Sequence, residues 1–422
     1  MCALSRRVVI ACVYLLSCGL GAYGQPVTLE LAIREAMENN LNILAERYNV
    51  SIAEAQIIQA RLRPNPILTV DSDHLPFAGT RYNLINGAGP AEFSIRTDVL
   101  MERGGKRRAR IAQAELARSV AELQLANSMR QLVFDVQSAF VDVLLAKENL
   151  TVSRRSLVAL EGITKVNLVR VNSGDLAKVE LVRSQVAALQ FRNEVRQSEL
   201  RVRTALNRLQ LLLGRTTPSP HFDVVGTLQR GRTIVLLDDL RRQALDFRPD
   251  LAALRRDHAR SQYAIRREIA EGKVDYLWGS EFRRQQGLAG TGNSIGLFFS
   301  APLPLFNKNQ GEILRAQREQ RQLELRIRAM QAEINNEVEN AYQQYAMAQN
   351  LLDSIETDML SQASDVQRIM EYSYRRGEAT LIEFLDAQRA YFETEQGYNE
   401  AMAEYTRTLF LLDSVAGKVG IP

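Results

Sequence analysis

The stretch that decides the fold is INNEVENAYQQYAMAQNLLDSIETDM, residues 334–359. Its apolar positions are separated alternately by four and three residues, which is the heptad spacing of a coiled coil. The series consists of Ile334, Val338, Ala341, Tyr345, Ala348, Leu352, Ile355 and Met359. A shorter series with the same spacing runs through Val133, Val136, Phe140 and Val143. Both stretches therefore predict coiled-coil helices.

The two series belong to an internal repeat. Ala112-Gln113-Ala114-Glu115 recurs 204 residues later as Ala316-Gln317-Arg318-Glu319, and Ser173-Gly174-Asp175 recurs 203 residues later as Arg376-Gly377-Glu378. A period near 200 residues is too long for a solenoid and indicates a tandem duplication. We predict a first repeat at 25–213, a linker at 214–236, a second repeat at 237–416 and a tail at 417–422.

Each copy is predicted to contain a helix, a β-hairpin and a helical hairpin. The β-hairpins are expected at 67–101 and 274–301, and the helical hairpins at 107–213 and 308–416. The opening helices are expected at 28–62 and 237–271. The longest helices contain about 65 residues, which corresponds to roughly 100 Å at 1.5 Å per residue. A single globular core does not require this length, so the sequence predicts extended shafts.

The predicted strands alternate between apolar and polar residues. In the second copy, Ile295, Leu297 and Phe299 interleave with polar or small residues, and the same period of two occurs at 93–101 and 274–284. Strands of about 9–11 residues with one apolar face are typical of transmembrane β-barrels. Four strands cannot close a barrel in lipid, where open sheet edges are not tolerated. Two soluble hairpins, or a barrel pooled from several chains, are the remaining alternatives, and the coiled-coil shafts favour the pooled barrel.

The composition excludes several chemistries. The chain has 422 residues, of which 46% are apolar and 24% charged, and its three cysteines are Cys2, Cys12 and Cys18. A disulfide framework, a zinc–thiolate site and a cysteine nucleophile are therefore excluded beyond residue 18. The three histidines are scattered, and the sequence contains no phosphate-binding loop, dinucleotide fingerprint or nucleophile elbow. We predict no enzyme activity, no cofactor and no metal site.

The N-terminus resembles an export signal. Arg6 and Arg7 precede the apolar run at 8–16, and small residues follow it. Cleavage after Gly24 would remove residues 1–24, whereas cleavage before Cys18 would make that cysteine a lipid anchor, and both alternatives stay open. Removing the signal leaves 51 basic against 49 acidic residues, a near-neutral balance that gives no support for binding to nucleic acid.

The repeat, the hairpins and the glycine-bearing helix tips together resemble the TolC-like outer-membrane efflux family. Arg63-Pro64-Asn65-Pro66, Gly104-Gly105-Lys106-Arg107 and Pro302-Leu303-Pro304-Leu305-Phe306-Asn307 are most similar to its cobalt-zinc-cadmium branch. The resemblance implies a mainly α-helical chain with four transmembrane strands. It also implies a homotrimer whose twelve strands form one barrel in outer-membrane lipid, continued into the periplasm by an α-helical barrel. The implied partners are a periplasmic adaptor and an inner-membrane exporter of the resistance-nodulation-division type.

The same resemblance assigns residues at the periplasmic tips. Its two aperture acids follow the second tip glycine by six and nine positions, which places them at Glu383 and Asp386, and the first-copy counterpart is Glu180. Three acids per chain in a narrow bore favour cations. The residues assigned to adaptor docking are Gly174, Asp175, Leu176, Gly377, Glu378 and Leu381. The basic residue with which the family closes its aperture has no clear match, and Arg375 and Arg376 are its possible substitutes.

Three functions stay open at this point. The resemblance favours a passive exit duct for heavy-metal cations, in which the inner-membrane pump selects the substrate. A duct for organic drugs or solvents is the first alternative. A soluble periplasmic coiled-coil scaffold is the second, although an adaptor of that kind would carry one helical hairpin rather than two.

Overall fold

The structure is a computed structural model that describes residues 26–75, 91–228, 235–287 and 290–418. The predicted signal peptide and the lipidation site at Cys18 lie outside these residues. Within them, the two copies contain the same order of elements. The first copy consists of α2 (Leu29–Asn39), α3 (Leu41–Arg61), β1 (Ile67–Asp73), β2 (Glu92–Met101), α4 (Lys106–Asn172) and α5 (Lys178–Leu212).

The second copy begins with α6 (Leu237–Phe247), α7 (Pro249–Glu271), β3 (Tyr276–Gly287) and β4 (Gly290–Ser300). It ends with α8 (Gln310–Ser354), the π-helix η1 (Ile355–Met359), α9 (Leu360–Arg376) and α10 (Leu381–Val415). The chain is thus mainly helical and internally duplicated, as the sequence predicts. None of the helices in the described ranges is both long and apolar enough to cross a membrane.

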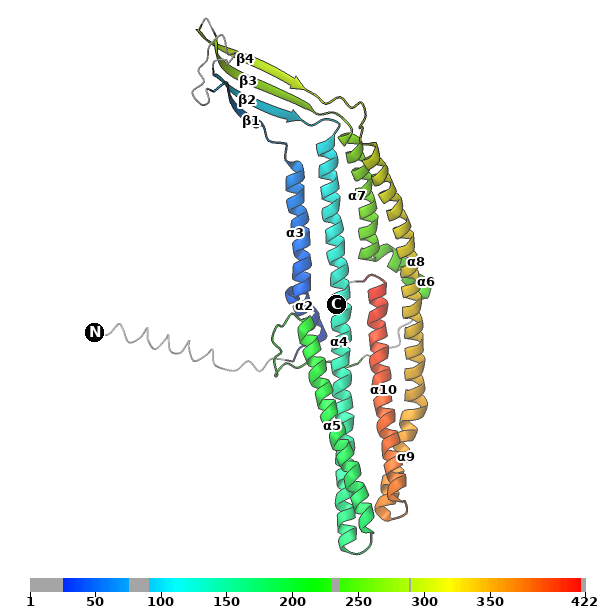
Figure 1. Cartoon of the computed structure of the whole chain (residues 1–422). Coiled ribbons are helices and arrows are strands. Elements are labelled where there is room, and N and C mark those ends of the chain that lie inside the picture. Colours follow the sequence, from blue (N-terminus) through cyan, green and yellow to red (C-terminus); the bar gives the residue numbers. More distant parts are fainter. Residues whose placement is uncertain (1–25, 76–90, 229–234, 288–289, 419–422) are drawn as a thin grey trace, which may run out of the picture. The chain divides into compact units, whose positions relative to one another are not determined.

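The chain divides into two compact units, and each unit draws on both copies. One unit contains 46–126 and 249–333, including the strands, and the other contains the remaining residues. In the first unit the strands form a single antiparallel sheet in the order β1-β2-β3-β4 (Figure 1). The two predicted hairpins are present as β1-β2 and β3-β4, and β2 also pairs with β3, with Ile95 opposite Phe282 and Val99 opposite Trp278. The two copies therefore share one sheet.

The pairing register gives the sheet two chemically different faces. One face carries large apolar side chains that are all exposed in the chain: Val70, Ile95, Val99, Trp278, Phe282, Ile295, Leu297 and Phe299. The opposite face carries ion pairs, with 2.9 Å between Arg96 and Asp98 and 2.8 Å between Arg283 and Glu281. Because side chains alternate along a strand, the period of two in the sequence produces this separation.

The predicted opening helices are wrong at one residue each, because each is broken in the middle. Asn40 separates α2 from α3, and its side chain accepts hydrogen bonds from Asn42 N (3.0 Å) and Ile43 N (3.2 Å). The Asn40 amide also donates to Leu212 O (2.9 Å) at the end of α5. At the corresponding place in the second copy, Arg248 precedes Pro249, and a residue before proline avoids the helical conformation.

The heptad residues form the core of the second unit. Ile334, Val338, Ala341, Tyr345, Ala348, Leu352 and Ile355 are all at most 8% exposed. Met359 is the exception at 51% exposed, although the heptad predicts it to be buried. It is the last residue of η1. A π-turn contains more residues than an α-turn, so it rotates the following side chains away from the seam. The seam prediction is therefore wrong at this one position.

Candidate functional site: the helix tips

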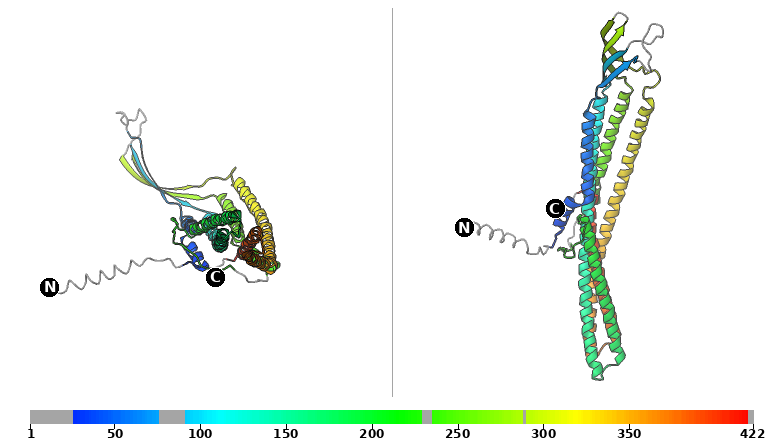
Figure 2. Two further views of the ribbon diagram at one scale, coloured as in Figure 1. Left: turned by 90° about the horizontal axis from the view of Figure 1, so that it is seen from below. Right: turned by 60° about the vertical axis from the view of Figure 1, so that its left-hand side comes forward.

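Two helical hairpins of the second unit end in tips that are built in the same way. In the first copy α4 turns into α5 (Figure 2), and in the second copy α9 turns into α10. Gly174 and Gly377 have left-handed φ angles of +84° and +83°. The next residue donates its backbone N–H to a carbonyl five residues earlier, over 2.8 Å from Asp175 to Arg170 and 2.9 Å from Glu378 to Ser373. This helix-ending motif favours glycine at its left-handed position.

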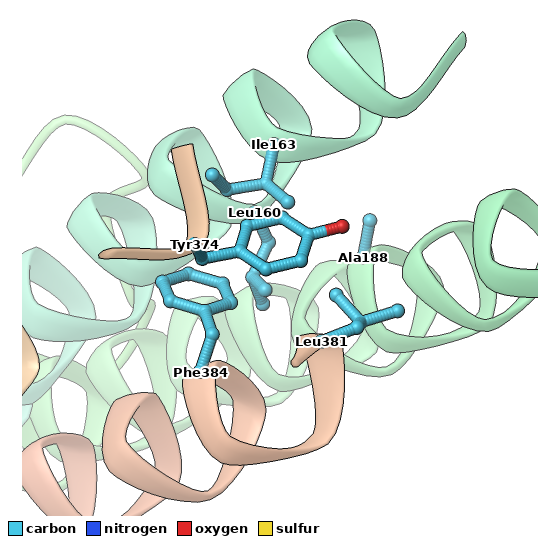
Figure 3. Close-up of a cluster of buried hydrophobic side chains, with 6 residues drawn as sticks. All are labelled: Leu160, Ile163, Ala188, Tyr374, Leu381 and Phe384. Atoms are coloured by element: carbon cyan, nitrogen blue, oxygen red, sulfur yellow. The ribbon is translucent and has the colours of Figure 1, made fainter. Parts of the chain in front are cut away.

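A compact apolar cluster lies beneath the tips and joins the two hairpins (Figure 3). Its members are Leu160, Ile163, Ala188, Tyr374, Leu381 and Phe384. The Tyr374 and Phe384 rings are stacked with centroids 5.6 Å apart. Leu381 is only 3% exposed, so its side chain packs inside this cluster and does not present a docking surface. The adaptor-docking role expected for Leu381 therefore disagrees with its position, because the packing face of an amphipathic helix begins at the first turn of α10.

Polar contacts also link the two hairpins. The Tyr374 hydroxyl donates to Asn167 Oδ1 over 2.7 Å, and both residues are buried. The Arg170 guanidinium donates to the backbone oxygens of Tyr374 (3.3 Å) and Arg375 (2.5 Å). These oxygens lie in the last turn of α9, where carbonyls lack helical partners and attract cations. Arg170 thus holds one tip to the other.

This link was not predicted from the sequence. Arg375 and Arg376 were considered as closing residues, but Arg375 pairs with Glu371 over 2.7 Å and Arg376 lies 4.6 Å from the Tyr372 ring centroid. Burial raises the pKa of the Tyr374 hydroxyl, and the Arg170 charge opposes this to a smaller extent. The available sequence signal was Tyr374 itself, an aromatic residue one turn before a helix-ending glycine, which suggests packing at the tip.

The three predicted aperture acids lie in different environments. Glu383 closes a capping box at the start of α10, where its carboxylate accepts from Thr380 N (2.8 Å) and Thr380 Oγ1 (2.9 Å). These hydrogen bonds, first the backbone one, lower the pKa of Glu383. Glu180 pairs with Arg183 over 2.9 Å. Asp386 is exposed one turn after Glu383, on the side of α10 away from the buried Phe384.

The two copies differ in charge at this site. Arg183 occupies the first-copy position that corresponds to Asp386, and Ala177 corresponds to the capping residue Thr380. Because Arg183 compensates Glu180, the uncompensated acids are those of the second copy. Of the three acids predicted for an aperture, Glu180 is thus paired, whereas Glu383 and Asp386 have no ion pair among the described residues.

The other predicted docking residues lie at the tips as expected. Asp175 and Glu378 are exposed, and Leu176 is half-buried. Val179 and Ile382, in the first turns of α5 and α10, are 55% and 54% exposed. The described parts of both tips thus combine acidic and apolar side chains on their surface. Throughout the described ranges, no group of three or more His, Cys, Asp or Glu side chains is placed to hold a metal ion.

Comparison with known proteins identifies the class. The model of the family described as "Outer membrane efflux protein" matches residues 32–215 and 240–418. The cobalt-zinc-cadmium resistance protein CzcC of Cupriavidus metallidurans is 24% identical over 395 residues, covering 93% of this chain and 90% of the relative. The cation efflux system protein CusC of Escherichia coli O157:H7 is 24% identical over 400 residues, covering 86% and 80%. A crystal structure of CusC has a TM-score of 0.74 at 18% identity, covering 92% of both chains.

The fold is therefore that of an outer-membrane channel whose helices extend into the periplasm. The protein belongs to the outer membrane efflux protein family. Members of this family are the outer-membrane components of tripartite efflux systems, which implies adaptor and pump partners.

Proposed function

We propose that this protein is a passive exit duct for heavy-metal cations and works as a homotrimer. The observation that carries the proposal is the sheet, in which one face is apolar and exposed while β1 and β4 each have one neighbour among the described strands. Sheet edges are not tolerated in hydrocarbon, so the edges must pair with other copies. Three copies would contribute twelve strands to one barrel.

The cation assignment is supported by the relatives and by the tips. CzcC is named as a cobalt-zinc-cadmium resistance protein, and CusC is named as a cation efflux system protein. Three copies of the tip would bring six acids, Glu383 and Asp386 of each copy, around one axis. Negative charge in a narrow opening raises the local concentration of cations and repels anions. A duct for organic drugs remains the second candidate, because such channels do not need to bind their cargo.

The proposed partners follow from the same arrangement. The tips would dock a periplasmic adaptor through Asp175, Leu176 and Glu378, with Gly174 and Gly377 shaping the turns. An inner-membrane exporter of the resistance-nodulation-division type would supply the energy and select the substrate. The duct itself needs no catalytic step.

Deletion of the gene tests the substrate. Cells that lack the protein are expected to become sensitive to cobalt, zinc, cadmium, copper or silver salts, and plasmid-borne wild-type protein should restore growth. Sensitivity to organic drugs alone would overturn the metal assignment and favour the second candidate.

Charge reversal tests the role of the tips. The double variant Glu383→Lys/Asp386→Lys should lower the cation selectivity of the trimer in planar bilayers, because the sign of the aperture charge changes. Asp365→Lys is a matched control, since Asp365 is an exposed acid on α9 that pairs with Arg368. If the double variant and the control have the same selectivity as the wild type, the constriction lies elsewhere in the channel.

A further inference from the structure

The segment between β4 and α8 exposes an unusual set of apolar side chains. Leu303, Leu305 and Phe306 are 78%, 71% and 90% exposed. Single exposed apolar residues are normal, but a contiguous group usually marks an interaction site. The odd-numbered residues of β4 form the apolar face of the sheet, and this alternation continues beyond the strand through Ala301, Leu303 and Leu305. The exposed apolar residues therefore follow directly after the apolar face in sequence, although the strand itself ends at Ser300.

The segment is held in a defined conformation. Leu305 N donates to Leu303 O over 2.8 Å in a tight turn, and Gln310 Nε2 donates to Phe306 O over 3.2 Å. Asn309, with a left-handed φ of +64°, fixes the end of the segment to α7 by donating to Glu268 O (2.9 Å) and Glu268 Oε2 (2.8 Å). These contacts present the apolar side chains outward from a fixed backbone.

The topology places this segment at the end of the sheet where the strands join the helices, which is the periplasmic end in the proposed barrel. The four strand ends that join helices α3, α4, α7 and α8 lie at the same end of the antiparallel sheet (Figure 1). Tyr276 and Trp278 lie near this end of the sheet. The centroid of the Phe299 ring is 5.2 Å from that of Tyr276 and 4.9 Å from that of Trp278. Aromatic clusters of this kind form the girdle at a membrane–water interface. The segment follows directly after this cluster.

Cations flank the segment. Lys273 and Lys308 are both exposed beside it. The nearby acids are engaged by another residue, because the buried Lys106 ammonium lies 2.7 Å from Asp275 and 3.4 Å from Glu271. Neither of these two acids therefore pairs with Lys273 or Lys308. Anionic lipid headgroups attract lysines placed at the level of the membrane surface.

We propose that residues 302–308 are an interfacial lipid anchor on the periplasmic side of the outer membrane. The side chains of Leu303, Leu305 and Phe306 enter the headgroup–acyl boundary, and Lys273 and Lys308 contact lipid phosphates. The inference rests on the proposed membrane barrel. The first copy has Glu102-Arg103-Gly104-Gly105 at the corresponding junction, so only the second copy carries this anchor.

Fluorescence quenching in membranes tests the proposal. Trp278 is the only tryptophan, so Trp278→Phe/Phe306→Trp gives a full-length trimer with one reporter in the segment. In vesicles whose lipids carry bromine near the headgroup end of the acyl chain, its emission should fall on the order of twofold, because an interfacial side chain lies roughly 5–10 Å deep. The control is Trp278→Phe/Leu325→Trp, at a 64% exposed position on α8, where no quenching is expected.

The wild-type protein separates the two proposals. Quenching of Trp278 together with an unquenched reporter at 306 would overturn the anchor alone, and would indicate that a neighbouring copy covers the segment. An unquenched Trp278 would contradict the membrane barrel itself.

A second measurement tests the lysines. The thermal unfolding midpoint of the trimer should be higher in vesicles with anionic phosphatidylglycerol than in pure phosphatidylcholine. Lys273→Gln/Lys308→Gln should lose most of this shift, whereas Lys165→Gln/Lys178→Gln, which changes two exposed lysines of the other unit, should retain it. Equal shifts in both variants would overturn the phosphate contacts.

Discussion

The hydrogen bond between Tyr374 and Asn167 allows a quantitative test of the tip structure. Tyr374→Phe removes the hydroxyl that donates over 2.7 Å to Asn167 Oδ1. Asn167 is fully buried, and its Nδ2 has no hydrogen-bond partner among the described residues. The variant therefore leaves a buried amide without any side-chain partner in the tip. An unsatisfied buried polar group costs about 1–3 kcal/mol, so local opening of the tips should become roughly 5–150-fold more frequent.

Amide hydrogen exchange of the intact protein measures this opening. Exchange should accelerate in α9, in the first turns of α10 and in α4 around residue 167. Tyr372→Phe is the matched control, because Tyr372 is 55% exposed on the same helix and its ring is kept beneath Arg376. The double variant Asn167→Leu/Tyr374→Phe should lose less stability than Tyr374→Phe alone, since both polar partners are then absent. Unchanged exchange in Tyr374→Phe, equal to that of Tyr372→Phe, would refute the stabilising role of this bond.

Three further predictions concern other positions of the same unit. Gly214→Ala should lower the thermal unfolding midpoint more than Gly174→Ala. Both glycines have left-handed φ angles, but only at Gly214 would the added Cβ collide with a backbone oxygen, that of Asn39. Equal midpoints of the two variants would contradict this packing. Burial raises the pKa of Tyr345 to about 12, and a raised folded-state pKa means that stability is lost as pH rises from about 10; Tyr345→Phe should reduce this loss in alkaline circular-dichroism titrations. Thr380→Ala removes the capping box that lowers the pKa of Glu383. In the wild type, protection of the tip amides should fall as pH drops below the ordinary glutamate pKa, and this loss should be weaker in the variant. Amide exchange measured at several pH values checks this.

The long-range periodicities were predictable because they are repeated many times. The heptad at 334–355 and the alternation of β4 each depend on a whole series of residues, so a few exceptions do not hide them. The helix breaks are harder to predict than the periodicities, because each depends on a single residue rather than on a series. Asn40 caps α3 locally and also donates a hydrogen bond to Leu212 O, and no local pattern reveals that distant partner. Pro249 did provide a local signal for the second break.

The site was predicted only in part, for a similar reason. The acids and glycines of the tips could be located by their spacing within the repeat. The contacts of Arg170 with α9 and the burial of Leu381 depend on how the two hairpins pack together. Side-chain partners across helices that are about 200 residues apart in sequence cannot be read from one helix alone.

The order of strands in the sheet also determines how copies can be joined. Among the described strands, β1 and β4 are the outer strands of the sheet, and they present different surfaces. If β4 of one copy pairs with β1 of the next, as in the proposed barrel, the contact is heterologous and closes as a rotational ring rather than a two-fold pair. Strand directions alternate, so β4 of one copy and β1 of the next also run antiparallel. A chain in which only β1 or only β4 can no longer pair would still join the proposed ring through its other outer strand, but the ring could not close. We therefore expect such a chain, when produced together with the intact protein, to act as a dominant inhibitor.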